Sequence, residues 1–202
     1  MSRSSVPSRP VLVETAVRIT QQPDADALLT RSPLALLVGA LLDRQVAAER
    51  AFAGPMAIAR RMGREDLDAH EIAQYSPSDF AALLAARPAV HEYPAFMARR
   101  IQELCRFLVA RYDGRAAAVW EDADSGGRLV RRVGELPGFG RQKAQIFTAL
   151  LGKQRGVRPD GWREAAGAYG EDGVFRSVAD ITGPDSLEKV RTSRQGRRRT
   201  TS

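Results

Sequence analysis

Apolar residues recur at helical spacing through most of the chain, and no segment alternates apolar and polar residues over a sustained stretch. The longest helical pattern runs from Tyr93 to Tyr112 and ends at Asp113-Gly114. Its apolar side carries four residues, Ile101, Leu104, Cys105 and Leu108. The pattern therefore predicts an all-α fold.

A central helix is expected from Pro33 to about Asp43, because this segment is apolar on nearly every side. Ser32 stands at the N-cap position, with Pro33 at the first helical position. Gly54-Pro55 predicts a kink or break in a helix that follows. The other expected helices cover residues 24–30, 47–62, 79–87, 116–121 and 128–134, with a glycine-rich turn at 125–127.

Net charge is +7 over 202 residues, and it resides at the two ends of the chain. Residues 1–18 carry +2 and residues 188–202 carry +5, so the body at 19–187 is neutral. Both ends lack apolar periodicity, and we expect both to be disordered around one helical domain. The basic end 188–202 is either a solvated tail or an electrostatic tether to a phosphate backbone.

Several protein classes are excluded by simple counts. The longest apolar run, Leu34–Leu42, is too short to span a membrane, and the first residues show no secretory signal pattern. Cys105 is the single cysteine, which excludes an internal disulfide and any multi-cysteine zinc or iron–sulfur site. His70 and His91 are far apart in the chain, which disfavours a zinc enzyme. We expect a cytoplasmic protein, nucleoid-associated if bacterial, without a cofactor.

The segment 129–147 is the most informative part of the sequence. A short apolar helix ends in Leu-Pro-Gly-Phe-Gly at residues 136–140, and a second helix begins at once. Two glycines around one bulky residue leave the backbone of the turn open. The N–H groups at the start of the second helix then favour an anion. The alternative is an ordinary corner between two helices.

The whole string, with apolar residues at Leu129, Val133, Leu136, Phe139 and Ala144, resembles the DNA-binding hairpin of the helix-hairpin-helix DNA glycosylase superfamily. This superfamily includes endonuclease III, adenine glycosylases and 3-methyladenine glycosylases. Segments 36–45 and 98–114 also resemble it, so that the likeness covers roughly residues 33–162. The resemblance implies two interlocked helical subdomains with a cleft between them. It also implies base excision repair on double-stranded DNA by a monomer.

The resemblance also implies roles for individual residues. An essential aspartate lies twenty-four positions after the hairpin leucine in much of the superfamily, and Leu136 leads in this way to Asp160. Asp160 is alternatively the N-cap of a helix that begins at 161 or 162. Gln45 corresponds to the glutamine that fills the gap left by an extruded base, or it is a surface residue at a helix end.

Further contacts follow from the hairpin itself. The resemblance implies a monovalent cation, Na⁺ or K⁺, on the backbone carbonyls of Gly134, Leu136 and Phe139. The residues expected to contact DNA, besides Gln45, are Leu136, Gly138, Phe139, Gly140, Arg141, Gln142 and Lys143.

The chain departs from the lyase-competent members at one position. They carry a nucleophilic lysine six positions after the hairpin leucine, where this chain has Gln142, and an amide cannot form a Schiff base. Lys143 is one residue further, a rotation of about 100° along a helix, and should point elsewhere. We therefore expect a monofunctional glycosylase, which extrudes a damaged or modified base and hydrolyses its N-glycosidic bond to leave an abasic site.

The sequence does not indicate which base is recognised. Four aromatic residues are candidates either for the core or for a base pocket, namely Tyr93, Phe96, Trp120 and Trp162. Glu164, Asp43 and Glu49 are reserve carboxylates if Asp160 is only a cap. Two other functions stay open: a catalytically inactive helix-hairpin-helix DNA-binding protein, and a helical protein-interaction domain.

Overall fold

The computed structural model describes residues 16–200, with side chains as far as Gly196. Its regular elements in this range are all helical, so the predicted all-α fold is confirmed. In chain order they are α1 (Pro23–Arg31), α2 (Pro33–Leu42), α3 (Ala48–Arg61), α4 (Ala69–Gln74), α5 (Pro77–Ala85), α6 (Pro94–Tyr112), α7 (Ala118–Glu121), α8 (Gly126–Gly134), α9 (Arg141–Gln154), α10 (Trp162–Ala166), two 3₁₀ turns η1 (Gly167–Tyr169) and η2 (Val178–Asp180), and α11 (Pro184–Thr200).

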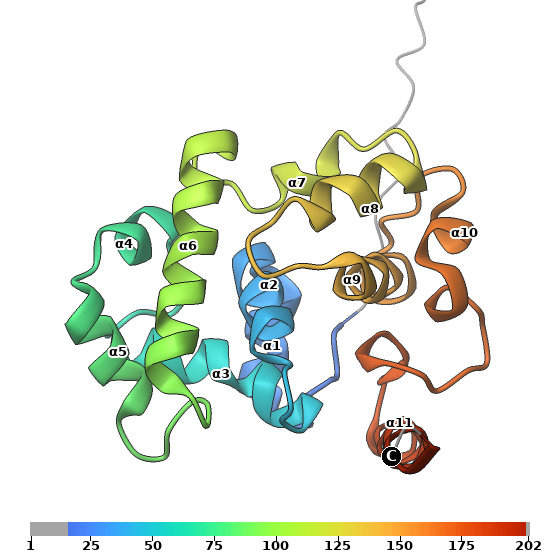
Figure 1. Cartoon of the computed structure of the whole chain (residues 1–202), viewed down its shortest axis with the longest axis horizontal. Helices are drawn as coiled ribbons and strands as arrows, with labels where there is room; N and C mark the ends of the chain where they lie inside the picture. Colours follow the sequence, from blue (N-terminus) through green and yellow to red (C-terminus); the bar gives the residue numbers. More distant parts are fainter. Residues whose placement is uncertain (1–15, 201–202) are drawn as a thin grey trace, which may run out of the picture.

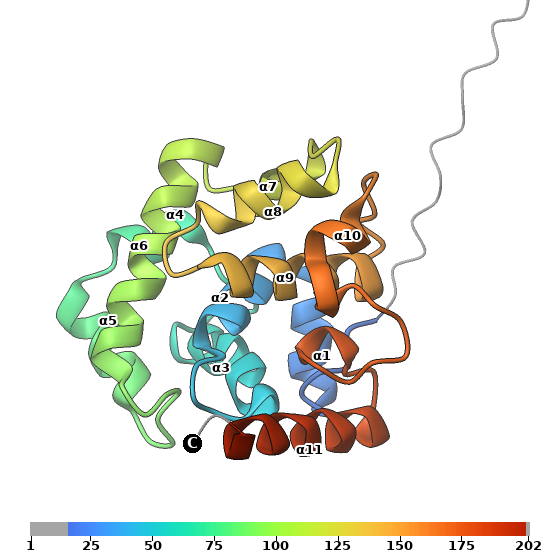
Figure 2. The same cartoon turned by 45° about the vertical axis from the view of Figure 1, so that its right-hand side comes forward.

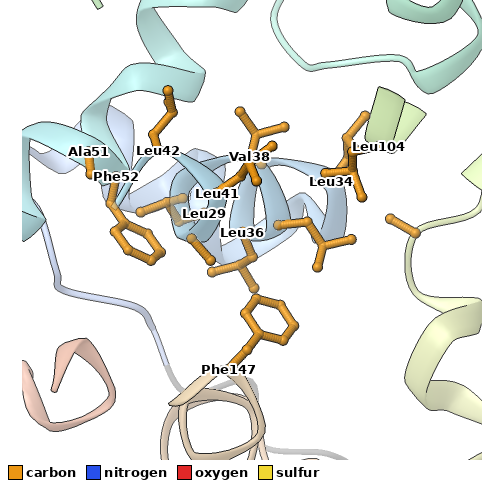
Figure 3. Packing of buried hydrophobic residues seen from close by; sticks show 14 of the residues in the cluster. Leu29, Leu34, Leu36, Val38, Leu41, Leu42, Ala51, Phe52, Leu104 and Phe147 are labelled. Carbon is orange, nitrogen blue, oxygen red and sulfur yellow. The ribbon is translucent and has the colours of Figure 1, made fainter. Parts of the chain in front are cut away.

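Helix α2 lies at the centre of the hydrophobic core, as its apolar sequence predicts. Every residue of α2 after Pro33 is buried. Leu36 of α2 points toward Phe147 of α9, and Leu34 lies near Leu104 of α6 (Figure 3). The remaining helices are arranged around this element, with α3 packed along it (Figure 1).

Two groups of helices flank the centre. On one side α6 packs against α4 and α5, and on the other α9 packs against α8 and α10 (Figure 1). Helix α2 contacts α3 and α6, and Phe147 of α9 reaches it. Distant segments of the chain therefore meet around α2 and its C-terminal end. The functional side chains discussed below gather at this end.

Local signals account for several helix boundaries. The hydroxyl oxygen of Ser32 accepts a hydrogen bond from the Ala35 N–H at 3.2 Å, which caps α2 as expected. Asp113 adopts a left-handed conformation with φ of 51°, and Gly114 follows with φ of 74°, so α6 ends where the sequence predicts.

Other boundaries differ from the sequence-based expectation. Helix α3 runs without interruption through Gly54-Pro55, where a kink or break was expected. Gly54 serves close packing instead, because a Cβ there would lie 2.5 Å from the Leu42 side chain. Ser125 caps α8, and Gly126 already belongs to that helix rather than to a turn. Helix α4 was not expected.

The largest difference from the sequence-based prediction is in the C-terminal segment, which is helical. Residues 188–200, expected to be disordered, continue helix α11 (Figure 2). Leu187 and Val190 are buried, which anchors the helix to the body despite its basic composition. At the other end, the predicted disorder of 1–15 lies outside the described residues. Val17 is buried, and its N–H donates to the Thr30 hydroxyl at 3.0 Å, which contradicts disorder there.

No single helix among the described residues is both long and apolar enough to cross a bilayer, and only α1 with α2, bent by 117°, reach that length and composition together.

Candidate functional site

A pocket of about 450 Å³ opens where α2 ends, beside the first half of α9. Segments from four parts of the chain form its walls: the end of α2 with the following loop, α9, the region from η1 to η2, and α11. The lining residues are Ala40, Asp43, Gln45, Val46, Gln142, Lys143, Ile146, Phe147, Leu150, Tyr169, Arg176, Val178 and Arg194. The pocket therefore has an apolar floor and a rim of charged and amide side chains.

Gln45 lies exposed at the rim of this pocket. Its backbone is left-handed, with φ of 61°, a conformation that residues other than glycine rarely adopt. Such strain persists only where the surrounding structure enforces it, and it is found preferentially at functional positions. Both interpretations of Gln45, a residue that enters DNA and a surface residue at a helix end, agree with this placement.

Asp43 is the carboxylate among the residues that line the pocket. Its side chain is 13% exposed, and Arg194 of α11 donates to both carboxylate oxygens, at 3.2 and 2.9 Å. A few residues further along, Glu49 accepts from Arg191 of the same helix. Helix α11 therefore holds both ends of the loop that carries Gln45 (Figure 2).

Lys143 of α9 reaches across to the C-terminal end of α2. Its ammonium group donates to the carbonyl oxygen of Ala40 and, at 3.3 Å, to that of Asp43. The pKa of Lys143 is lowered to about 8, chiefly by burial; the Asp43 carboxylate opposes this effect, and the guanidinium groups of Arg44 and Arg194 add to it. The carbonyls at a helix C-terminus favour the charged form of a lysine, so this amine ties α9 to α2.

Lys143 and Gln142 point in different directions from α9, as their spacing predicts, yet both line the pocket. Gln142 donates to the hydroxyl of Tyr169 at 2.7 Å, whereas Lys143 extends toward α2. Neighbouring side chains on a helix are separated by a rotation of about 100°. The lysine side chain is long enough to reach the carbonyls at the end of α2 and so forms part of the pocket wall.

The segment between α8 and α9 makes the tight turn that its glycines predict. Gly138 has φ of 87°, and a Cβ there would lie 2.4 Å from the Leu41 side chain, so both conformation and packing require glycine. Leu136 and Phe139 are buried, and the Phe139 ring packs edge-on against Phe147 at 5.8 Å between centroids. Of these two residues, only the backbone can contact a ligand.

The start of α9 is open to solvent. Gly140 is its N-cap and provides no capping side chain, and a Cβ on Gly140 would meet nothing within 4 Å. The first N–H groups of a helix have no partner within it, so those of Arg141 and the next residues are available to an anion. Arg141 and Gln142 are also exposed. The turn and the helix start thus present backbone donors beside the pocket.

The carbonyls proposed to hold a monovalent cation lie at the end of α8 and in the turn that follows it. The carbonyl oxygen of Leu136 accepts the Phe139 N–H at 2.9 Å, which leaves its second lone pair for another ligand. Gly134 is exposed at the end of α8. Among the described residues, no group of three or more His, Cys, Asp or Glu side chains is arranged to hold a metal ion. The monovalent cation stays a prediction.

Asp160 is not brought together with Gln45. Its side chain is exposed and does not line the pocket, while its carbonyl oxygen accepts the Gly126 N–H at 2.7 Å in an isolated bridge with Ser125. It is not a helix cap either, because Gly161 occupies the N-cap position of α10 without a side-chain hydrogen bond. The structure therefore places Asp160 neither in the pocket nor at the N-cap of α10.

The reserve carboxylates and candidate aromatics divide between site and core. Asp43 lines this pocket and Glu49 a neighbouring hollow, whereas Glu164 is exposed on α10. Trp120 is buried against Phe147. Trp162 is buried at another hollow, and Tyr93 is 53% exposed.

Sequence reasoning missed Tyr169, Arg176 and Arg194 as pocket residues. They lie beyond the segment that carries the resemblance, and only the apolar positions of Leu187 and Val190 could have signalled that α11 packs on the body. The chain matches no family model, no curated protein and no solved structure.

Proposed function

We propose that this protein is a DNA glycosylase that extrudes a damaged or modified base from double-stranded DNA and hydrolyses its N-glycosidic bond. The observation that carries the proposal is the pocket of about 450 Å³ between Gln45 and the solvent-open start of α9. A backbone anion site next to a pocket of this size suits a nucleotide whose phosphate is bound outside and whose base is bound inside. In this proposal the helices form two interlocked subdomains and the pocket occupies their cleft.

Each wall of the pocket has a role in the proposed reaction. The extruded base packs against the apolar floor at Ile146 and Phe147, and Tyr169 and Gln142 offer hydrogen bonds to its edge. Gln45 occupies the gap in the duplex. This division agrees with the exposure of Gln45 and with the burial of Phe147.

Asp43 is the carboxylate that we assign to the chemistry. As the C1′–N bond breaks, its electron pair leaves with the base and positive charge develops on the sugar. A carboxylate in an enclosed wall stabilises that charge, and the paired Arg194 holds the Asp43 carboxylate in place. Water then adds its hydroxide to C1′ and its proton ends on the departing base, which leaves an intact strand with an abasic site.

Lys143 has a positioning role in this scheme. Its amine donates to two carbonyls at the end of α2, which fixes the segment that carries Asp43. Gln142 occupies the position of the lyase nucleophile in the resembling family and cannot attack C1′. We therefore propose hydrolysis without strand cleavage.

The proposal is tested with duplexes that each carry one damaged or modified base. The protein is expected to release one such base and to leave an abasic site that hot alkali converts into a strand break, with no break before alkali. Borohydride added during the reaction is expected to trap no covalent adduct. An adduct that disappears in Lys143→Met would replace the hydrolytic scheme by one with a lysine nucleophile.

A catalytically inactive DNA-binding protein is the second candidate. The bidentate Arg194–Asp43 pair favours it, because the arginine offsets the charge that the reaction needs. Duplex binding without release of any base from the panel would support this alternative.

The open N-cap at Gly140 gives a test of DNA binding. Gly140→Asp is expected to weaken binding to an undamaged duplex at least tenfold, because a carboxylate then occupies the anion site at the start of α9. Aspartate is also a good N-cap, so unfolding should change by only a few tenths of a kcal/mol. Binding is measured by fluorescence anisotropy and stability by thermal unfolding.

Gly127→Asp is the matched control for this substitution. Gly127 is also exposed, a Cβ there also meets nothing within 4 Å, and it lies in the first turn of α8. The control makes the same change of net charge away from the turn. Equal loss of binding in both variants would contradict the assignment of the anion site to Gly140.

A further inference from the structure

Three arginines from two distant segments surround the ring of Phe96. Arg44 comes from the loop after α2, while Arg99 and Arg100 belong to α6 together with Phe96. Their guanidinium carbons lie 5.9, 5.8 and 5.2 Å from the centroid of the ring. Stacking on the aromatic ring keeps three like charges close together.

Acidic side chains offset little of this charge. Arg99 lies 3.9 Å from the Glu103 carboxylate in an exposed pair, which contributes little. In the part of the chain that the structure describes, neither Arg44 nor Arg100 has a carboxylate within 4 Å. Asp43, next to Arg44 in the chain, is engaged by Arg194. The cluster therefore retains positive charge that an anion from outside can neutralise.

A buried histidine holds the two segments together. The Nδ1 atom of His91 accepts the Tyr93 N–H at 3.1 Å, so the ring proton resides on Nε2. Nε2 in turn lies 3.1 Å from the carbonyl oxygen of Arg44 and donates to it. His91 itself is 2% exposed. The arginines are thus brought together by the fold, and binding an anion requires little rearrangement of the backbone.

The cluster adjoins the turn between α8 and α9. Arg44, Phe96 and Arg100 line a hollow of about 150 Å³ together with Gly138 of that turn. Lys143 and Asp43 also line it, the latter with its carboxylate paired to Arg194. Arg44 directly precedes Gln45 in the chain. The cluster therefore also lies beside the residue that we propose fills the gap left in the duplex by the extruded nucleotide. The anion site at the start of α9, the arginine cluster and Gln45 are therefore neighbours around the end of α2.

We infer that Arg44, Arg99 and Arg100 bind phosphate groups of the DNA strand that contacts the turn, next to the nucleotide that is extruded. This inference rests on the proposed function, since it extends the DNA contact beyond the turn. A guanidinium group pairs with phosphate oxygens through two parallel hydrogen bonds, and its flat face stays on the aromatic ring. The hollow beside Gly138 accommodates one such phosphate.

The salt dependence of duplex binding tests the inference. The double variant Arg44→Gln/Arg100→Gln is compared with the unaltered protein on an undamaged duplex, over a series of salt concentrations. Each phosphate contact contributes roughly 0.9 to the slope of log K against log salt, so the slope should fall by roughly 2. Affinity at low salt should fall roughly tenfold or more.

Arg111→Gln/Arg163→Gln is the matched control. Arg111 also stacks on an aromatic ring, Phe107 at 5.8 Å, and Arg163 stacks on Trp162 at 4.5 Å, but neither adjoins the turn. This control removes the same charge and the same type of stacking, so its slope should change by less than half as much. Arg44→Lys/Arg100→Lys preserves the charge and should preserve the slope.

The outcomes separate this inference from the function on which it rests. Equal slopes for the test pair and the control pair, with duplex binding intact, would overturn the inference alone. An unaltered protein that binds no duplex at all would overturn the proposed function and the inference with it. If the glutamine pair is destabilised, the single variants Arg44→Gln and Arg100→Gln replace it: a fall of the slope by roughly 1 in each supports the inference, and an unchanged slope in both contradicts it.

Discussion

Asp43→Asn is expected to slow base release by roughly 10²–10³, while duplex binding stays within a few-fold of the unaltered protein. The substitution removes one preorganised charge, a loss of about 3–4 kcal/mol in the transition state, and it leaves the side-chain volume nearly unchanged. The amide oxygen can still accept a hydrogen bond from Arg194, which limits the loss of stability. Single-turnover base release on the substrate found in the panel is the measurement.

Two companion variants distinguish a chemical role of Asp43 from a structural one. Arg194→Gln breaks the same ion pair but retains the carboxylate, so base release should stay within about tenfold of the unaltered rate. Equal losses in Asp43→Asn and Arg194→Gln would show that only the pair matters. Asp160→Asn should retain full turnover, because its side chain is exposed away from the pocket. Full turnover in Asp43→Asn with loss in Asp160→Asn would return the catalytic role to Asp160.

Removal of residues 184–202 is expected to destabilise the protein by about 3–6 kcal/mol. This estimate follows from exposing Leu187 and Val190, which are 7% and 1% exposed, at about 1.5–3 kcal/mol for each buried side chain. The truncation also removes Arg191 and Arg194, which hold Glu49 and Asp43 on either side of Gln45. Urea unfolding measures the stability, and amide hydrogen exchange should show reduced protection at residues 43–49.

The matched control removes only residues 197–202. It deletes three arginines and leaves Leu187 and Val190 in place, so the free energy of unfolding should stay within about 0.5 kcal/mol of the unaltered value. Should the longer truncation fail to fold, Leu187→Ala replaces it, with an expected loss of about 2–3 kcal/mol. Equal stability of the two truncated chains would mean that α11 does not brace the body.

Much of the helical framework was determined by the sequence itself. Ser32 and Pro33 start α2, Asp113-Gly114 ends α6, and the apolar composition of α2 requires burial on all sides. These features depend on residues within a turn or two of one another, so no knowledge of distant segments is needed. The glycine-rich turn before α9 is local in the same sense.

Only the tertiary structure decided which polar residues share the pocket. Asp43 and Arg194 are separated by most of the chain, and Arg194 lies in a segment whose composition indicates disorder. The low pKa of Lys143 likewise depends on burial between α9 and the end of α2. Helix α11 forms because two buried apolar residues and two acidic partners on the body offset the repulsion of its arginines. The pattern of residues within the segment does not predict these interactions, because the residues that α11 contacts lie far away in the sequence.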